Sequence, residues 1–557
     1  MVREELEKLF RKDLQCFYSD NLDCYLLSEF DKNILSTLKE DCFSQEVLGI
    51  YRKFVEMKQE APAQMKKQLF ITIRNYAKEN FENKNYVETL VLYRFLIVKS
   101  ETLAEDYSII AEVCADLGLI DIAEKFISIY EKKELNKAVL FITLGNFYNL
   151  KVKNYKRAIK YYEKYLEIDK TKPVVYTIVG NLYKKVYGDS SLEDQIFYYE
   201  KANKLKPNDR LINHMLAFSY EKLGKKEQAN TCYKNLLTLN STEIDLYNYG
   251  SFLISCGNFG DGHKYFSHRF NIDDINLEYP IKICPEKKWD LKSDISNKTL
   301  LVHYEQGFGD TFMYCRFVPG LTKYANKVIF VVQDELIDLI KASPIISEKV
   351  ELISDKTNLA DLEFDVHMAL LDAPLVLKTE IDSIPYSDGY LTVEDNKIIN
   401  YANKYIEKSC NLKVGIACSG DKNANYNGRD IDIEKFNILT NVECLDFYLL
   451  QKDIECSNPK IKSLGKTFET FSDTAAAIKN MDIVISTDNV ILNLAGALGV
   501  KTYALFNKST NYRWFKLEGN DVGWYSSVCP LQVDYTDNWN SVFLELVNIL
   551  SSCKNYK

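Results

Sequence analysis

Small and large apolar residues recur along the first half of the chain in units of about 34 positions. In each unit a small residue follows a large apolar one, and another small or aromatic residue comes about a dozen positions later. The units are marked by Ile110-Ala111, Leu144-Gly145, Val179-Gly180, Leu216-Ala217 and Tyr249-Gly250. Small residues fit where two helices cross and large ones where they interlock, so each unit predicts a pair of helices.

A single helix pair cannot bury its own apolar face, so neighbouring pairs must stack. The pattern therefore predicts an all-α solenoid over residues 71–275, preceded by a helical segment over residues 1–70. An irregular helical bundle is the alternative.

The pattern changes after about residue 270, where short apolar runs alternate with helical stretches. The first series of expected strands is Thr299–His303, Val328–Val332, Val350–Ile353 and Phe364–Met368. After a helical stretch at Lys397–Lys408, the second series is Leu412–Ala417, Asp446–Gln451, Asp482–Ser486 and Lys501–Leu505, followed by a last helix at Trp539–Ser551.

This alternation predicts two α/β lobes, each built on a parallel sheet. We expect a linker at residues 276–297, an N-terminal lobe at 298–408 and a C-terminal lobe at 409–557. Open parallel sheets bind ligands beyond the carboxyl ends of their strands, so a cleft is expected between the lobes. The alternative is one large sheet without a cleft.

Composition narrows the choice of function. With 557 residues and a net charge of −9, the chain suits two to four domains and not a protein that coats nucleic acid or anionic lipid. The start, Met1-Val-Arg-Glu-Glu-Leu6, lacks a signal-peptide pattern, and no apolar run reaches the ~20 residues of a membrane helix. We expect a cytoplasmic protein whose 14 scattered cysteines are reduced and hold no structural metal.

A glycine-rich turn follows the first expected strand of the N-terminal lobe. It contains Gly307, Gly309 and Asp310 and precedes an expected helix at Phe312–Pro319. Glycines let backbone N–H groups approach a ligand at the positive end of a helix. Asp310 there is a candidate general base for a hydroxyl. The alternative is that Asp310 only caps the helix.

The second candidate site follows the strand that ends at Ser486. Thr487, Asp488 and Asn489 come next, and an apolar helix carrying Asn493 and small residues for tight packing follows. Free N–H groups at this helix start would hold a diphosphate. Alternatively, Thr487 and Asp488 cap the helix and do nothing more.

Two further segments supply cations. Ser419, Lys422 and Arg429 lie in a long polar loop after the first strand of the C-terminal lobe, and Lys452 ends the next strand. A departing diphosphate needs such charge, although a solvated loop is the alternative. Asp430-Ile-Asp432 formally matches a metal-binding DxD, but the motif is short and common by chance.

Together these motifs carry a family resemblance. Residues from about 289 to 535 resemble the glycosyltransferase half of bacterial tetratricopeptide-repeat proteins, which is itself similar to heptosyltransferase-like glycosyltransferases of family 9 and GT-B fold. The matching stretches are Lys298 to Asp310, Phe364 to Pro374, Gly428-Arg429-Asp430, Leu449 to Lys452, Asp473 to Gly499, Tyr512-Arg513-Trp514 and Trp524-Tyr525. The helix pairs of the first half resemble tetratricopeptide repeats.

The resemblance implies an inverting, metal-independent transfer from a nucleotide-sugar bound by the C-terminal lobe. Asp310 would be the base, and Arg429, Lys452 and the Asp488–Asn493 helix start would hold the donor. Two departures are visible: Asn493 replaces a usual histidine, and Ala417-Cys418 stands where a tryptophan is usual. Neither a cofactor nor a metal is implied.

The repeats would supply the acceptor. Asn146 and Asn181 occupy the same position in successive units, and the resemblance places it on the concave face of the solenoid. Their amides could bind a peptide backbone, or they could be solvated surface residues. The expected function is glycosyl transfer to a protein Ser or Thr, for example of a flagellin-like protein. The alternatives are a non-enzymatic scaffold with a degenerate transferase domain and a transferase that acts on a glycan.

Overall fold

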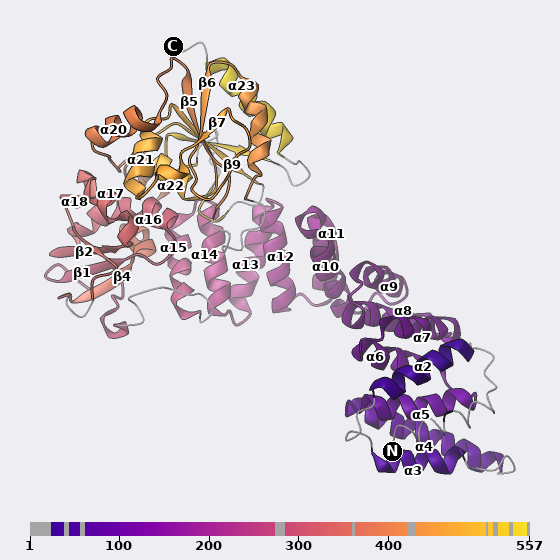
Figure 1. Ribbon diagram of the computed structural model, residues 1–557. Helices are drawn as coiled ribbons and strands as arrows, with labels where there is room; N and C mark the ends of the chain where they lie inside the picture. The colour runs from indigo at the N-terminus through magenta and orange to yellow at the C-terminus, as the bar shows by residue number, and fades with distance from the viewer. Residues whose placement is uncertain are drawn as a thin grey trace. The chain divides into compact units, whose positions relative to one another are not determined.

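The chain forms two compact units, Met1–Pro207 and Asn208–Lys557 (Figure 1). The computed structural model describes residues 10, 24–37, 44–55, 62–272, 284–358, 362–420, 429–507, 511–515, 522–533 and 539–553. Within these ranges, none of the helices combines the length and the hydrophobicity that crossing a bilayer requires.

The first unit is helical throughout its described ranges. Its α-helices are α2 (Cys24–Thr37), α3 (Gln45–Val55), α4 (Ala63–Glu82), α5 (Tyr86–Val98), α6 (Ala104–Asp116), α7 (Ile120–Lys133), α8 (Lys137–Asn146), α9 (Tyr155–Ile168), α10 (Pro173–Tyr187) and α11 (Leu192–Leu205). From α4 onward they pack as consecutive pairs, as the repeat pattern predicts.

Glycine and tyrosine interlock at the crossings of these pairs. A Cβ on Gly145 would lie 2.7 Å from the ring of Tyr162, and one on Gly180 would lie 2.5 Å from the ring of Tyr199. Both tyrosines are buried. The expectation of small residues where helices cross is confirmed.

The second unit begins with two more helix pairs. They are α12 (Arg210–Lys222) with α13 (Lys226–Thr238), and α14 (Glu243–Ser255) with α15 (Phe259–Phe266), after which a 3₁₀ turn runs over Ser267–Asn271. The repeat array therefore spans the boundary between the two units.

The N-terminal lobe has a four-stranded parallel sheet in the order β3-β2-β1-β4. The strands are β1 (Thr299–His303), β2 (Lys327–Val332), β3 (Glu351–Ser354) and β4 (Val366–Ala369). The α-helices are α16 (Phe308–Tyr314), α17 (Ile337–Lys341), α18 (Pro344–Ser347), α19 (Ala373–Val376) and α20 (Asp395–Tyr405). Each predicted strand is present, within two residues of the expected start.

The C-terminal lobe has a six-stranded parallel sheet in the order β10-β9-β8-β5-β6-β7. The strands are β5 (Leu412–Ala417), β6 (Leu445–Leu449), β7 (Ile461–Ser463), β8 (Ile483–Thr487), β9 (Thr502–Phe506) and β10 (Val528–Gln532), and the α-helices are α21 (Phe471–Lys479), α22 (Val490–Ala497) and α23 (Asn540–Cys553). Counted within the lobe, the order is that of the doubly wound dinucleotide-binding fold. Strands β7 and β10 are absent from the sequence prediction.

The two sheets are separate, so the alternative of one large sheet is wrong. The fold class, helical repeats followed by two Rossmann-like lobes of GT-B type, is confirmed. Both sheets reverse their strand order beside the first strand of the lobe, between β1 and β4 and between β5 and β8. Such switch points are where open α/β sheets bind ligands.

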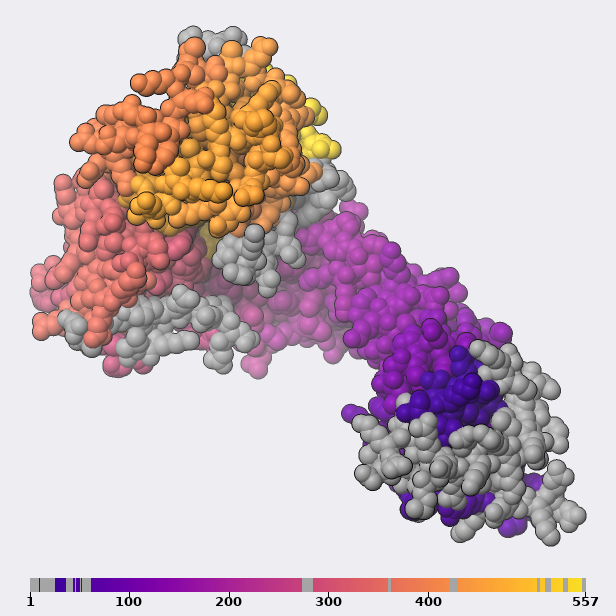
Figure 2. Space-filling model, viewed as in Figure 1, coloured from indigo at the N-terminus to yellow at the C-terminus, as the bar shows by residue number. Residues whose placement is uncertain are grey.

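The lobes contact each other and the last helix pair. Backbone N–H groups of Tyr390 and Leu391 donate to Ala497 O at 2.8 and 3.0 Å. Arg316, fully buried, donates through Nη1 to Trp524 O at 2.6 Å. One apolar core runs from α14 and α15 through the N-terminal sheet to α22 and Trp524. In the space-filling view, atoms of the two lobes adjoin (Figure 2).

A buried charge cluster joins the end of the repeats to the N-terminal lobe. Arg269 is fully buried and donates to Glu305 at 2.6 and 2.7 Å and to Asp372 at 2.8 Å. Three buried charges are tolerated only because each is paired. Residues 208–272 are therefore part of the same folded unit as the lobes.

Candidate active site

The N-terminal side of the site is the turn from β1 into α16. The helix begins at Phe308 and not at Phe312 as expected, with Gly307 as its N-cap. Asp310 therefore lies in the first turn, and the alternative that it is the cap is wrong. Its side chain is 14% exposed.

The two glycines of this turn differ in what surrounds them. A Cβ on Gly309 would lie 3.1 Å from Asn493 Nδ2 and 3.8 Å from Val490 Cα, because α16 packs against α22. A Cβ on Gly307 would meet only Asp310 Oδ2, at 4.0 Å. A side chain at position 309 would therefore press on Asn493 where the two lobes approach each other, whereas the space around Gly307 is open.

The C-terminal side of the site is the turn from β8 into α22. Ser486 and Thr487 are the last residues of β8 and are fully buried, and Asp488 is half-buried. Asn489 is the N-cap of α22, so the alternative that Thr487 or Asp488 caps this helix is wrong.

The cap uses two of the amides expected to face a diphosphate. Asn489 Oδ1 accepts from Ile491 N at 2.9 Å and from Leu492 N at 3.2 Å. The expectation of free N–H groups at this helix start is wrong for those two residues. The cap itself is fixed by Ser486 Oγ, which donates to Asn489 Oδ1 at 3.1 Å.

Asn493 lies in the contact between the lobes. It is 6% exposed, accepts from Tyr525 OH at 3.2 Å and donates from Nδ2 to Asn489 O at 3.3 Å. The amide thus fits the space over Gly309 and has hydrogen-bond partners within its own lobe.

Asp310 and Asp488 share one charged cluster with two arginines. Arg513 forms an ion pair through Nε with Asp310 Oδ1 and a hydrogen bond through Nη2 with Gln306 Oε1. Burial raises the pKa of Asp310, while Arg513 opposes the rise and Asp488 adds to it. Burial also raises the pKa of Asp488, and Trp514, Arg513 and Arg429 oppose it. The two carboxylates are thus close enough to repel each other, and the arginines oppose that repulsion.

Two tyrosine hydroxyls complete the cluster. In the part of the chain that the structure describes, the buried hydroxyls of Tyr314 and Tyr512 have no hydrogen-bond partner. The charges of Arg513 and Asp310 both influence these phenols. Buried polar groups are rarely left unsatisfied, so these hydroxyls are available to a polar ligand.

The polar loop after β5 supplies one cation to the cluster. Arg429 packs its guanidinium on the backbone of Gly420, where a Cβ would collide with it. Its side chain is 17% exposed. Lys422 lies outside the described residues. Lys452 is exposed after β6, and nothing in the described contacts brings it to the cluster.

Gln451 is a site-shaping residue that the sequence analysis missed. Its side chain accepts from Cys418 N at 2.5 Å and from Ser419 N at 3.2 Å, and donates to Ser419 O at 2.7 Å. Gln451 therefore fixes Ser419 at the end of β5. Its only signal in the sequence is its place in Leu449 to Lys452.

Both carboxylates of the formal DxD have structural uses. Asp430 Oδ1 accepts from Gly420 N at 2.9 Å, and Asp432 Oδ1 accepts from Glu434 N at 3.0 Å. Asp430, next to Arg429, is thereby joined to Gly420.

Asn146 and Asn181, in the first unit, share one arrangement. Tyr162 OH donates to Asn146 Oδ1 and Tyr199 OH donates to Asn181 Oδ1, both at 2.8 Å. The two asparagines are exposed. The repeated bond turns the Oδ1 atoms toward the tyrosines and leaves the amide NH₂ groups as the donors that the asparagines can offer.

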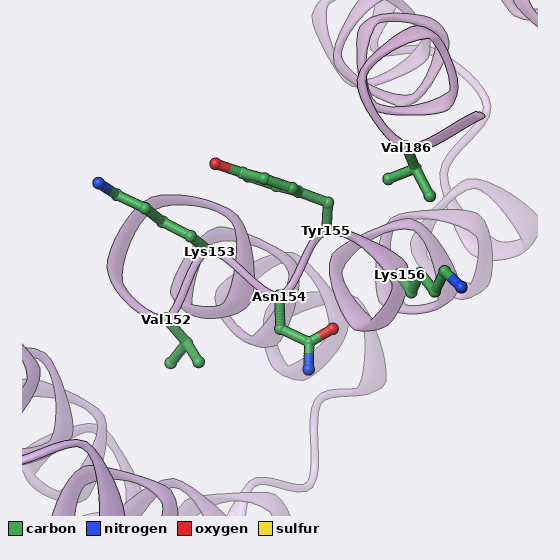
Figure 3. A pocket seen from close by; sticks show the side chains of 6 residues that line it. All are labelled: Val152, Lys153, Asn154, Tyr155, Lys156 and Val186. Carbon is green, nitrogen blue, oxygen red and sulfur yellow. The ribbon is translucent and has the colours of Figure 1, made fainter. Parts of the chain in front are cut away.

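A separate hollow of about 500 Å³ opens among the repeats, beside the start of α9 (Figure 3). The residues that line it are Val152, Lys153, Asn154, Tyr155, Lys156 and Val186. None of the predicted site residues is among them.

Known proteins are similar to both halves of the chain. Residues 138–172 and 212–243, which hold α8–α9 and α12–α13, match the tetratricopeptide repeat family. Protein FlbA of Caulobacter vibrioides is 22% identical over 393 residues, which cover 64% of this chain. The chain spans 63% of the length of that relative.

Two solved structures are similar to parts of the chain. A glycosyl transferase family 9 structure from Veillonella parvula, 12% identical, covers 48% of this chain and 92% of its own, with a TM-score of 0.33. Pseudomonas aeruginosa PilF, 13% identical, covers 37% and 91%, with a TM-score of 0.30. The family match lies in the helical repeats, and the two parallel sheets follow it in the chain.

Proposed function

We propose that this protein is a glycosyltransferase that moves a sugar from a nucleotide-sugar donor to an acceptor between its two lobes. The observation that carries the proposal is the charged cluster at the switch points of both sheets. Asp310 comes from one lobe, Asp488 from the other, and Arg429 and Arg513 lie near them.

Asp310 is the general base in this proposal. Its carboxylate takes the proton of the acceptor hydroxyl as that oxygen bonds to the anomeric carbon of the donor. The bond from that carbon to the phosphate oxygen breaks, and its electron pair leaves with the nucleoside diphosphate. One displacement of this kind inverts the configuration and needs no metal if cations of the protein neutralise the leaving group.

The C-terminal lobe binds the donor in this proposal. Arg429 faces the departing diphosphate, and the sequence offers Lys422 and Lys452 as further cations for it. Ser419, Ser486, Thr487, Asn489 and Asn493 are the donor-side residues of this proposal, and Gly307 and Gly309 belong to the turn of the other lobe that faces them. Asp488 accepts hydrogen bonds from hydroxyls of the donor, since a carboxylate does not suit a phosphate.

The repeats bind the acceptor in this proposal. The amides of Asn146 and Asn181 suit the backbone of an extended peptide, and a Ser or Thr of that protein, for example one like flagellin, is modified in the cytoplasm. In a variant of this proposal the acceptor is a glycan, and the repeats bind another protein of the same biosynthetic complex.

A scaffold without turnover is the second candidate. The observation that favours it is the close packing of α16 on α22, together with the capped amides of α22. Both features reduce the backbone surface that a diphosphate could reach.

Binding of a nucleotide separates the two candidates. The full chain is melted in the presence of UDP-, GDP-, ADP- and dTDP-sugars, each with its free nucleotide as reference. The transferase proposal predicts that one nucleotide family raises the melting temperature and that its sugar is slowly hydrolysed. If none of them raises it, the scaffold is favoured.

A further inference from the structure

Arg513 is the residue that connects the two lobes within the charged cluster. It belongs to the C-terminal lobe, yet its guanidinium contacts Asp310 and Gln306 of the N-terminal lobe. Its Nη1 donates to Asn511 Oδ1 of its own lobe at 2.8 Å. The side chain is 12% exposed. The Arg513 guanidinium thus lies where groups from both lobes meet.

The backbone of Arg513 is held firmly. Trp524, which is fully buried, donates its indole N–H to Arg513 O. The ring of Tyr512 packs against Phe266 with centroids 5.2 Å apart, and the Arg513 guanidinium lies 4.6 Å from the Tyr512 ring centroid. Because the backbone is fixed, a change of partner at Arg513 requires only rotation of its side chain.

We propose that Arg513 receives the diphosphate of the donor, and that its ion pair with Asp310 must open for it to do so. This inference rests on the proposed function. It names Arg513 as a catalytic residue, although no role was assigned to it from the sequence.

The chemistry of the groups supports an exchange of partners. A guanidinium pairs with phosphate in a bidentate manner, and the higher charge of a diphosphate competes well with one carboxylate. While Arg513 pairs with Asp310, the positive charge of the guanidinium lowers the pKa of that carboxylate and makes it a weaker base. When a donor takes Arg513, the electron pair of the broken bond goes to an oxygen beside a cation, and Asp310 is released to take the acceptor proton.

A purely structural role is the competing explanation. In that case Arg513 ties the lobes together through Asp310 and Gln306 and has no contact with donor. Removing either partner would then lower stability, and nucleotide affinity would change only through the loss of folded protein.

Affinity for a nucleoside diphosphate distinguishes these roles. The probe is whichever of UDP, GDP, ADP and dTDP binds the wild-type chain, measured by calorimetry on the full-length protein. Arg513→Gln is expected to weaken binding by about 10- to 100-fold, the loss of a charge-assisted pair. Asp310→Asn is expected to tighten binding several-fold, because it frees Arg513 from its competitor.

The double variant gives the decisive comparison. If Asp310 acts by holding Arg513, then Asp310→Asn produces no gain in a chain that already carries Arg513→Gln. If the gain persists, Asp310 merely repels the phosphate and the opening of the pair is overturned. Unchanged affinity in Arg513→Gln overturns the role of Arg513 altogether.

Two further variants guard against loss of folding. Arg513→Lys keeps the charge and stem, so it is expected to lose less affinity than Arg513→Gln and serves in the same comparison if the glutamine variant does not fold. Arg157→Gln, at an exposed arginine paired with Glu124 at 2.9 Å, is the matched control and should bind like wild type.

If the wild-type chain binds none of the four nucleotides, the proposed function fails and the inference fails with it. If it binds one and Arg513→Gln binds equally, only the inference fails.

Discussion

Asp310 lies beside one cation and two other carboxylates, and these neighbours decide its chemistry. Burial, Asp488 and Glu305 all raise its pKa, and Arg513 lowers it. A carboxylate whose pKa is raised is a stronger base once ionised, which suits proton transfer from a hydroxyl. The balance depends on residues from both lobes, so it exists only in the folded unit.

The pH profile of transfer tests this balance. Only ionised Asp310 can accept a proton, so kcat/KM should rise with pH through a pKa above the ordinary carboxyl value. Arg513→Gln removes the group that lowers the pKa and should move this acidic limb to higher pH, whereas Arg513→Lys should leave it nearer to wild type. An acidic limb at the same pH in all three chains would contradict this account of Asp310.

At the scale of elements, the sequence predicts the strands that are framed by polar residues. Strand β5 is found at Leu412–Ala417, as expected, because a polar joint precedes it and a polar loop follows. The short strand β7 has three residues and β10 contains Pro530, so neither shows a clear strand pattern. Local pattern is weakest at such edge strands.

The position of the candidate site could be predicted from the sequence, but the contacts between its residues could not. Its segments follow β1, β5 and β8, and parallel sheets gather such segments at one edge. The early start of α16 was missed because Gly307 and Gly309 favour a turn, and packing on α22 outweighs that preference. The partner of Asp310 was missed because an ion pair between distant segments has no local signal.

The small residues of α22 provide a prediction at this scale. A Cβ on Gly496 would lie 2.5 Å from Tyr525 Cγ, and Tyr525 is buried and bonded to Asn493. Gly496→Ala should therefore overpack the lobe and cost about 1–3 kcal/mol. Gly307→Ala, with open space around it, is the control and should melt within a degree or two of wild type. Equal melting temperatures for the two variants would show that α22 can shift.

At the scale of the whole molecule, the last repeats and the lobes form one unit. Phe259 of α15 packs against Phe515 and Trp524 with ring centroids 5.1 and 5.4 Å apart. Arg269 is the counterion of Glu305 and Asp372. The boundary that matters for folding is therefore that between Pro207 and Asn208, inside the repeat array.

Two truncations test this boundary. A fragment of residues 208–557 should fold cooperatively, whereas residues 271–557 should not, because they lack Arg269 and the aromatic contacts of α15. Circular dichroism and thermal melts of both fragments measure this. A folded 271–557 fragment would show that the last repeats are dispensable for the lobes.

Arg269→Leu measures how much the buried ion pairs contribute to the stability of the intact chain. Leaving Glu305 and Asp372 buried without a counterion should cost about 3–5 kcal/mol at neutral pH. Burial raises the pKa of Asp372 and Arg269 opposes that rise. In the variant, Asp372 is protonated more readily, so the stability deficit should shrink as the pH falls. A deficit that is constant with pH would place the cost elsewhere.

The central claim is that sugar transfer takes place at Asp310, between the lobes. The most direct measurement compares wild type with Asp310→Asn, using the nucleotide-sugar that binds and intact-mass detection of modified acceptor protein. The account predicts that Asp310→Asn loses at least about 1,000-fold in transfer while it binds the nucleotide at least as tightly as wild type. Transfer at the wild-type rate by Asp310→Asn would contradict it.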